Sequence, residues 1–176
     1  MPSLEMVDVV DEHDRPVGRA SLRSCLKGGL LHRAVAVIVV RPGGGILLQQ
    51  RNKEDLWQSG RWTLSCTGHV KAGETYIHAA RRELSEELGL HSPVRRISKL
   101  LLPRVTSRGM TEREWVALFA SETEMRAKVN PVELEDVREY DVAGLRAMLT
   151  GKRLTSDARI LLAEYLRLSG DYPSPS

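Results

Sequence analysis

Three glutamates crowd one short stretch in the middle of the chain. Glu83, Glu86 and Glu87 are three and four residues apart, and residues at this spacing share one face of an α-helix. Like charges so placed cost roughly 0.2–0.5 kcal/mol per pair on a bare helix, so the crowding favours a bound cation. Carboxylate oxygens suit Mg²⁺ or Mn²⁺, and Mg²⁺ usually reaches its site with substrate phosphates. The alternative is a helix whose acidic face is simply solvated.

The residues around these glutamates predict the helix that would position them. Thr75 can cap its start with the side-chain oxygen, and Gly89 suits the left-handed residue that follows its end. Glu74 can accept from Arg82 and fix the preceding loop against the helix. Apolar residues recur at helical spacing and predict a stripe facing the core: Ile77, Ala80, Leu84 and Leu88. The glutamates lie off this stripe, where the loop beginning at Gly68 turns back.

The stretch from Gly68 to Leu90, GHVKAGETYIHAARRELSEELGL, resembles the Nudix box. That motif is G-x5-E-x7-R-E-U-x-E-E-x-G-U, with U aliphatic, and every specified position is met. The resemblance implies a hydrolase that uses Mg²⁺ or Mn²⁺ to cleave a diphosphate linked to another moiety. It also implies that the carboxylates matching Glu83, Glu86 and Glu87 bind the metal and that the backbone carbonyl of Thr67 completes the site. Arg82, counted with the catalytic residues, would hold the loop rather than take part in the chemistry.

The composition predicts a single domain. The chain has 176 residues, of which 41% are hydrophobic, and its net charge is +3. We expect residues 1–168 to form the domain and residues 169–176 to be a flexible tail. We expect no nucleic-acid partner, because Lys and Arg form no block and no aromatic ladder accompanies them. We expect a cytoplasmic protein that crosses no membrane, since the sequence shows neither a signal peptide nor a long apolar run, and its two cysteines form no CxxC pair.

Periodicity along the chain predicts an α/β fold. Strands alternate with helices in a way that suits helices packed on both faces of a mixed sheet. The same α/β/α sandwich is what the Nudix resemblance implies, here with an N-terminal β-hairpin extension. Strands are predicted at 4–10, 17–20, 32–41, 46–51, 62–70, 93–104, 111–120 and 137–142. Helices are predicted after Thr75 and at 143–149 and 156–168, with a short helix or loop at 21–29.

A second resemblance, over about residues 4 to 120, is to isopentenyl-diphosphate isomerase. It rests on the stretches 7–20, 29–35 and 49–69, with the sequences VDVVDEHDRPVGRA, GLLHRAV and QQRNKEDLWQSGRWTLSCTGH. Four residues match positions of the isomerase metal site: His32, His69, Glu112 and Glu114. A further histidine of that site would fall near Cys25. The catalytic cysteine aligns with Thr67, and Cys66 comes one residue early. Because side chains alternate along a strand, we expect Cys66 to point away from the site.

The remaining candidates surround the expected mouth of the site. Arg51 could hold a phosphate with two hydrogen bonds, and Trp57 could stack on a base. His69 and Glu112 are counted with the substrate-binding residues. His32 opens an apolar strand, and we interpret it as a strand cap. A metal-activated water would lose its proton to Glu83 or Glu114.

These residues favour hydrolysis of a diphosphate bond in a nucleoside diphosphate linked to another moiety, or in a similar small-molecule diphosphate. Two alternatives stay open. One is an isomerase-like enzyme that acts on allylic diphosphates, and the other is a non-enzymatic, ligand-sensing Nudix domain. An intact triad of glutamates argues against the sensor, and the Thr67 hydroxyl argues against the isomerase, because it does not replace a thiol as proton donor. A homodimer is a possible assembly of the protein.

Overall fold

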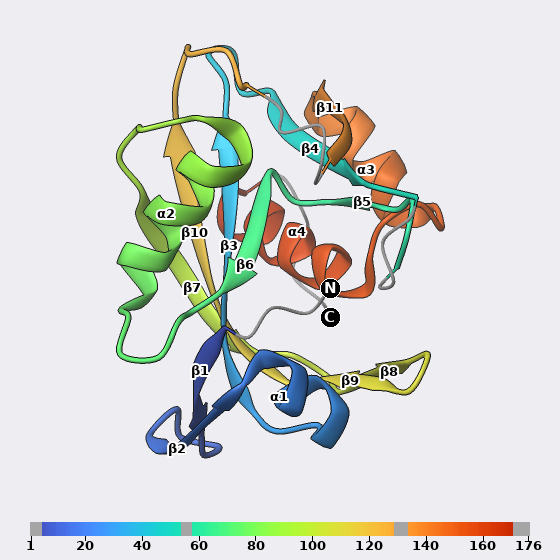
Figure 1. The fold of residues 1–176 in the computed structure, drawn as a ribbon. Coiled ribbons are helices and arrows are strands. Elements are labelled where there is room, and N and C mark those ends of the chain that lie inside the picture. Colours follow the sequence, from blue (N-terminus) through green and yellow to red (C-terminus); the bar gives the residue numbers. More distant parts are fainter. Residues whose placement is uncertain (1–4, 54–57, 129–133, 171–176) are drawn as a thin grey trace.

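The computed structural model describes residues 5–53, 58–128 and 134–170. Two long strands, β3 (His32–Val40) and β10 (Glu114–Glu122), lie parallel at the centre of a nine-stranded mixed sheet (Figure 1). Both consist largely of Val, Ile, Leu, Ala and Phe and are buried on both faces, as is typical of central parallel strands. Their register places Glu114 beside His32, so two residues with functional side chains begin neighbouring strands.

The other strands extend this sheet on either side. On one side β7 (Arg95–Leu101) pairs antiparallel with β10. On the other side β6 (Cys66–His69) pairs with β3, while β4 (Ile46–Arg51) carries β5 (Trp62–Thr63) and β11 (Leu134–Tyr140). The predicted single strand at 62–70 is therefore wrong: it is two strands with different partners. Ser65 occupies the break, where its hydroxyl donates to the Leu47 carbonyl and accepts from the Val39 N–H.

Helices cover both faces of the sheet and confirm the α/β/α architecture. One face packs against α2 (Tyr76–Leu88), and the other packs against α3 (Val142–Thr150) and α4 (Ser156–Leu168) (Figure 1). Each face has its own apolar core. The α2 side includes Val35, Val37, Leu84 and Phe119. The α3 and α4 side includes Ala36, Ile38, Leu118 and Leu161.

The predicted caps of α2 are confirmed. Thr75 accepts from the His78 N–H, and Gly89 follows the helix with a φ of 61°. The predicted apolar stripe holds at Ala80, Leu84 and Leu88, which are fully buried. It is wrong at Ile77, which is 37% exposed, because Ala79 and Ala80 take the buried places on this part of the helix.

The N-terminal hairpin is present as predicted. It consists of β1 (Met6–Val10) and β2 (Pro16–Ser21), and α1 (Leu22–Gly28) follows it. A second hairpin, β8 (Val105–Ser107) with β9 (Met110–Glu112), corrects two predictions, the turn at 106–110 and the single strand at 111–120. Arg108 and Gly109 both adopt positive φ, which gives the tight two-residue turn that such hairpins prefer.

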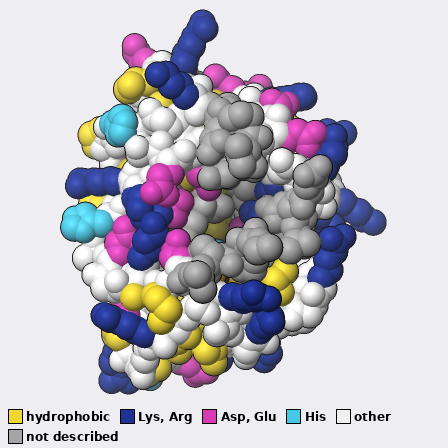
Figure 2. Space-filling model, viewed as in Figure 1, with side chains coloured by type: hydrophobic (Ala, Val, Ile, Leu, Met, Phe, Trp, Pro, Cys, Tyr) yellow, Lys and Arg dark blue, Asp and Glu magenta, His cyan; other side chains and the backbone are white. Residues whose placement is uncertain are grey.

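Two further features concern membrane-spanning helices and the charge on one face of the molecule. No helix in the described part of the chain is long and apolar enough to cross a membrane. On the face drawn in Figure 2, Lys and Arg side chains are spread around the outline, and acidic side chains lie among them.

Candidate active site

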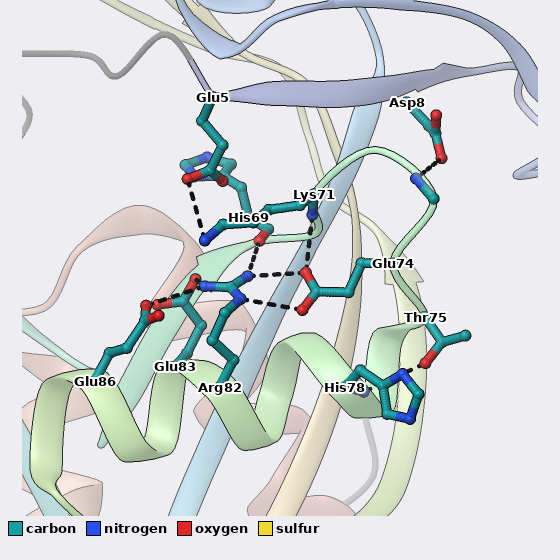
Figure 3. A network of polar contacts seen from close by, with 11 residues as sticks. Glu5, Asp8, His69, Lys71, Glu74, Thr75, His78, Arg82, Glu83 and Glu86 are labelled. Carbon is teal, nitrogen blue, oxygen red and sulfur yellow. Dashed lines mark hydrogen bonds and ion pairs between the residues drawn. The ribbon is translucent and has the colours of Figure 1, made fainter.

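Arg82, on α2, is the centre of an ion-pair network that joins the helix to the loop before it (Figure 3). Its Nε and Nη2 atoms donate to the Glu74 carboxylate at 3.0 and 2.9 Å, as the sequence predicted. Its Nη1 donates to Glu83 at 2.5 Å and to Glu86 at 3.2 Å, and Nη2 also donates to the His69 carbonyl at 2.9 Å. Burial disfavours the charge of Arg82, but the Glu74 and Glu83 carboxylates outweigh it and raise its pKa. Arg82 thus fixes the loop, the helix and β6 to one another.

Glu83 lies against the backbone of β6 in a space that only glycine leaves open. A Cβ atom added at Gly68 would lie 2.1 Å from the Glu83 Cδ atom, so any larger residue would displace the carboxylate. The Glu83 side chain is 13% exposed, and burial raises its pKa although Arg82 opposes the shift. A buried carboxylate with a raised pKa suits a cation, whose charge would compensate for the lost water.

Glu87 reaches the same strand from the next turn of α2. Its Oε2 atom accepts from Gln49 Nε2 at 3.1 Å and lies 3.4 Å from the Thr67 N–H. Along β6, the Thr67 N–H and the His69 carbonyl point away from β3. In an antiparallel ladder, the N–H and the C=O of one residue point in the same direction. The Thr67 carbonyl therefore also points to the edge where Glu83 and Glu87 lie. Glu86 is 52% exposed beside them.

A second group of potential metal ligands lies on the other face of the sheet. The Glu114 Oε1 atom is 3.2 Å from His32 Nε2 and 3.1 Å from His69 Nε2. The three side chains offer ligand atoms within 4.8 Å of one another. Their nitrogen and oxygen atoms are a donor set that suits Zn²⁺, Mn²⁺ or Fe²⁺. The resemblance matches His32 to the isomerase metal site although its place in the sequence favours a strand cap, and the structure brings it into this group.

The proton on His32 can be assigned from its surroundings. His32 Nδ1 lies 2.9 Å from the Leu30 carbonyl, which can only accept, so Nδ1 carries a proton. Its Nε2 atom faces Glu114, is fully buried and makes no hydrogen bond among the described residues. Nε2 is therefore the ring nitrogen that could bind a cation together with the Glu114 oxygen, 3.2 Å away. Hydrogen bonding of the distal nitrogen to a carbonyl is also how metal-binding histidines are usually oriented.

The charges in this group reinforce one another. Burial alone would raise the pKa of Glu114, but the neighbouring His32 and His69 side chains lower it far below its usual range. Burial alone would lower the pKa of His69, but the hydrogen bond and the charge of Glu114 raise it. Glu114 is therefore an anion at neutral pH, as a metal ligand must be.

A pocket adjoins this group between β8, β9 and α4. Its apolar wall consists of Leu102, Pro103, Val105 and Ile160. Its polar wall consists of Glu112, Glu114, Ser156 and Asp157. No sequence pattern distinguishes Asp157, which lies in the first turn of α4, two residues after the cap residue Thr155. Burial, together with the charge of Glu114, raises the pKa of Asp157.

The other predicted residues fall into distinct places. Glu112 lines the pocket from β9. Arg51 ends β4, where its N–H donates to the Arg61 carbonyl. Trp57 lies outside the described residues. The structure thus brings the box glutamates to one side of β6 and Glu114, His69 and Glu112 to the other.

Cys66 and Thr67 have opposite orientations, as predicted. Cys66 is fully buried in the core against α2, whereas Thr67 pairs with Ala36, which belongs to the core on the other face. Burial, with the nearby Glu87 and Glu83 carboxylates, raises the pKa of the Cys66 thiol. The Thr67 side chain is therefore on the same face as His69, and the thiol is not.

The chain is similar to known proteins in both sequence and fold. The NUDIX domain family matches residues 30–162. "Isopentenyl-diphosphate Delta-isomerase 2" of Photorhabdus laumondii is 32% identical over 145 residues, which are 82% of each chain. An "Uncharacterized Nudix hydrolase" of Pseudomonas aeruginosa is 30% identical over 134 residues, 76% of this chain and 77% of the relative. The crystal structure of DR0079 from Deinococcus radiodurans shares the fold, with a TM-score of 0.74, 20% identity, and coverage of 90% of this chain and 97% of that one.

Proposed function

The chain belongs to the NUDIX domain family, and from this premise we propose that it hydrolyses a diphosphate bond in a small molecule with the help of a divalent cation. The observation that carries the proposal is the complete set of box glutamates on one side of β6, where Arg82 holds Glu83 and Glu86 and the Thr67 N–H faces Glu87. The NUDIX match and relatives named as diphosphate isomerases and as a Nudix hydrolase support action on a diphosphate.

In this proposal each residue has a separate task. Glu83, Glu86, Glu87 and the Thr67 carbonyl would hold Mg²⁺ or Mn²⁺, which neutralises a diphosphate and assists attack by water. Arg82 keeps Glu83 and Glu86 at the strand edge through its fork of hydrogen bonds. Of the two expected bases, Glu83 would take the proton of the attacking water, because Glu114 lies on the other side of β6 with His32 and His69. Arg51 would contact the phosphate chain.

Isomerisation of an isoprenoid diphosphate is the second candidate. The group of His32, His69 and Glu114 favours it, since these residues match the metal-site positions of the isomerase. Two observations oppose it. Thr67 offers a hydroxyl where that enzyme has its cysteine, and Cys66 faces the opposite side of the sheet. Cys25, near the position of a further histidine, is buried with Val7 and Leu22 in an apolar cluster.

The test separates the two reactions in one experiment. The protein is incubated with a panel of nucleoside diphosphate derivatives and with isopentenyl diphosphate, each with Mg²⁺ and with Mn²⁺, and products are followed by ³¹P and ¹H NMR. We expect cleavage of at least one diphosphate and no dimethylallyl product. Accumulation of the allylic isomer at an enzyme-like rate would reject hydrolysis as the main activity.

The variant Glu87→Gln tests whether the observed reaction depends on the box glutamates. The change keeps the shape of the side chain and removes the charge that a cation requires, so we expect turnover to fall at least about 100-fold. The loss of the carboxylate from its contact with Gln49 should cost only about 1 kcal/mol of folding stability. Circular dichroism and thermal unfolding measure the fold. Turnover equal to wild type at saturating Mg²⁺ would contradict the metal assignment.

A further inference from the structure

Gln49 is a buried amide on a strand face that otherwise packs into an apolar core. Leu47, two residues earlier on β4, belongs to the core against α2, and side chains two apart share a face. Gln49 is only 2% exposed. Its cross-strand neighbours are Thr63 on β5 and Val137 on β11. A hydrophobic side chain would fill this position without burying polar atoms.

The amide of Gln49 is satisfied at one end only. Its Nε2 atom donates to Glu87 Oε2 at 3.1 Å, and its Oε1 atom is buried with no hydrogen-bond partner among the described residues. A buried acceptor without a partner destabilises the folded protein. Packing therefore gives no reason for a glutamine here, whereas its contact with Glu87 does.

The contact joins two elements that are far apart in the sequence. Glu87 lies in the last turn of α2, and Gln49 lies on β4, 38 residues earlier. The Thr67 N–H also faces Glu87 Oε2, but at 3.4 Å it is long for a hydrogen bond. Gln49 therefore makes the better of these two hydrogen bonds to the carboxylate oxygen that both approach.

We propose that Gln49 is a positioning residue that holds the Glu87 carboxylate at the edge of β6, ready to bind the divalent cation. The inference rests on the proposed function, because it requires Glu87 to be a metal ligand. Residues that orient metal ligands through hydrogen bonds typically change metal affinity 10- to 100-fold when they are replaced. Gln49 would act on cation binding and not on the chemical step.

The same strand offers a matched control. Gln50 is the next residue, and its Nε2 atom donates to the Gly60 carbonyl at 2.9 Å. Gly60 lies outside the box. Gln49→Met and Gln50→Met therefore remove the same amide from adjacent positions, and only the first removes a contact with Glu87. Methionine keeps the unbranched shape of glutamine, so packing changes least.

The experiment is a Mn²⁺ titration of the substrate-free protein by electron paramagnetic resonance, with Glu87→Gln used to identify the class of sites that depends on the box. For that class, we expect Gln49→Met to weaken Mn²⁺ binding about tenfold and Gln50→Met to change it less than twofold. In turnover assays, Gln49→Met should need more Mn²⁺ for half-maximal rate but approach the wild-type kcat at saturation.

The outcomes separate the inference from the proposed function. Wild-type Mn²⁺ affinity in Gln49→Met, or equal weakening in both methionine variants, would overturn the role of Gln49 alone. Unchanged binding in Glu87→Gln would instead reject the metal assignment itself. If Gln49→Met unfolds, Gln49→Asn takes its place, since it keeps the amide but is one methylene too short to reach Glu87. It should weaken Mn²⁺ binding to a similar degree, and wild-type binding in it would equally overturn the proposal.

Discussion

At the scale of single residues, Gly68 makes the closest fit of the site. A Cβ atom there would overlap the Glu83 carboxyl group, whereas the backbone of Gly68 does not have a positive φ and tolerates alanine. In Gly68→Ala the flexible Glu83 side chain should therefore move. We expect folding stability within about 1 kcal/mol of wild type and metal-dependent turnover at least about 100-fold lower. Thermal unfolding and steady-state kinetics of the variant measure the two effects, and wild-type turnover would refute the fit.

A substitution at Cys66, in contrast, should leave turnover almost unchanged. Its thiol is fully buried and its pKa is raised, so little thiolate is present at neutral pH. We expect it to resist iodoacetamide in the folded protein, and we expect Cys66→Ser to retain turnover within a few-fold. Mass spectrometry after alkylation and kinetics of the variant provide the check. Loss of activity in both experiments, with the fold preserved, would favour the isomerase.

The site residues were only partly predictable from sequence. The box fixes Glu83, Glu86 and Glu87 because helical spacing makes them neighbours whatever the remainder of the fold does. The grouping of His32 with Glu114 depends on a parallel pairing of two distant strands, which local patterns do not specify. Asp157 joins the pocket only because α4 starts beside Glu114. Nothing in the sequence singled out Gln49, since glutamine side chains are mostly exposed.

At the scale of elements, the N-terminal hairpin is fastened to the domain by its turn residue Asp14. The Asp14 side chain is 7% exposed and accepts from Arg33, Lys99 and Tyr76 at 2.6, 2.7 and 3.0 Å. Burial alone would raise its pKa, but these partners lower it below the usual 3.8. Asp14 thus attaches the turn of the hairpin, while the pairing of β1 with β3 and the hydrogen bond from the Gly73 N–H to Asp8 hold its first strand.

Asp14→Asn tests this attachment through its pH dependence. Because the folded-state pKa of Asp14 is lowered, its stabilising effect is complete above about pH 5 and is lost as the pH falls through 3.8 and below. Asparagine also tolerates the positive φ of 61° at this position, so the change removes mainly charge. We expect the variant to be about 2 kcal/mol less stable at pH 7. Urea unfolding at pH 7, 5 and 3.5 should show this gap closing, and a gap that widens in acid would contradict the assignment.

The elements themselves were predictable where local signals were strong. The caps Thr75 and Gly89 delimit α2 correctly because cap preferences are properties of single residues. The hairpin of β8 and β9 was missed because Arg108 adopts a positive φ that its residue type does not announce. The split of the strand at 62–70 was missed because it depends on which neighbouring strand each half finds.

At the scale of the whole molecule, cation binding should be coupled to folding. The box glutamates come from α2, while the groups that face them come from β4 and β6, so the binding site exists only when these elements are packed together. A ligand that binds the folded state alone raises stability by RT ln(1 + [L]/Kd), about 2.7 kcal/mol at 100 times Kd. We expect Mn²⁺ at such a concentration to raise the unfolding temperature, and EDTA to reverse the rise. An unchanged temperature in calorimetry would exclude this coupling.

The parallel pairing of β3 with β10 also has a consequence for the order of folding. His32 and Glu114 become neighbours only after a loop of about 80 residues has closed, and parallel contacts between distant segments form slowly because the entropy of loop closure is lost first. The box helix, by contrast, is built from contacts within a few residues. A chain emerging from the ribosome would therefore complete its acidic helix early and its two-histidine group late, since β10 must be synthesised before His32 meets Glu114.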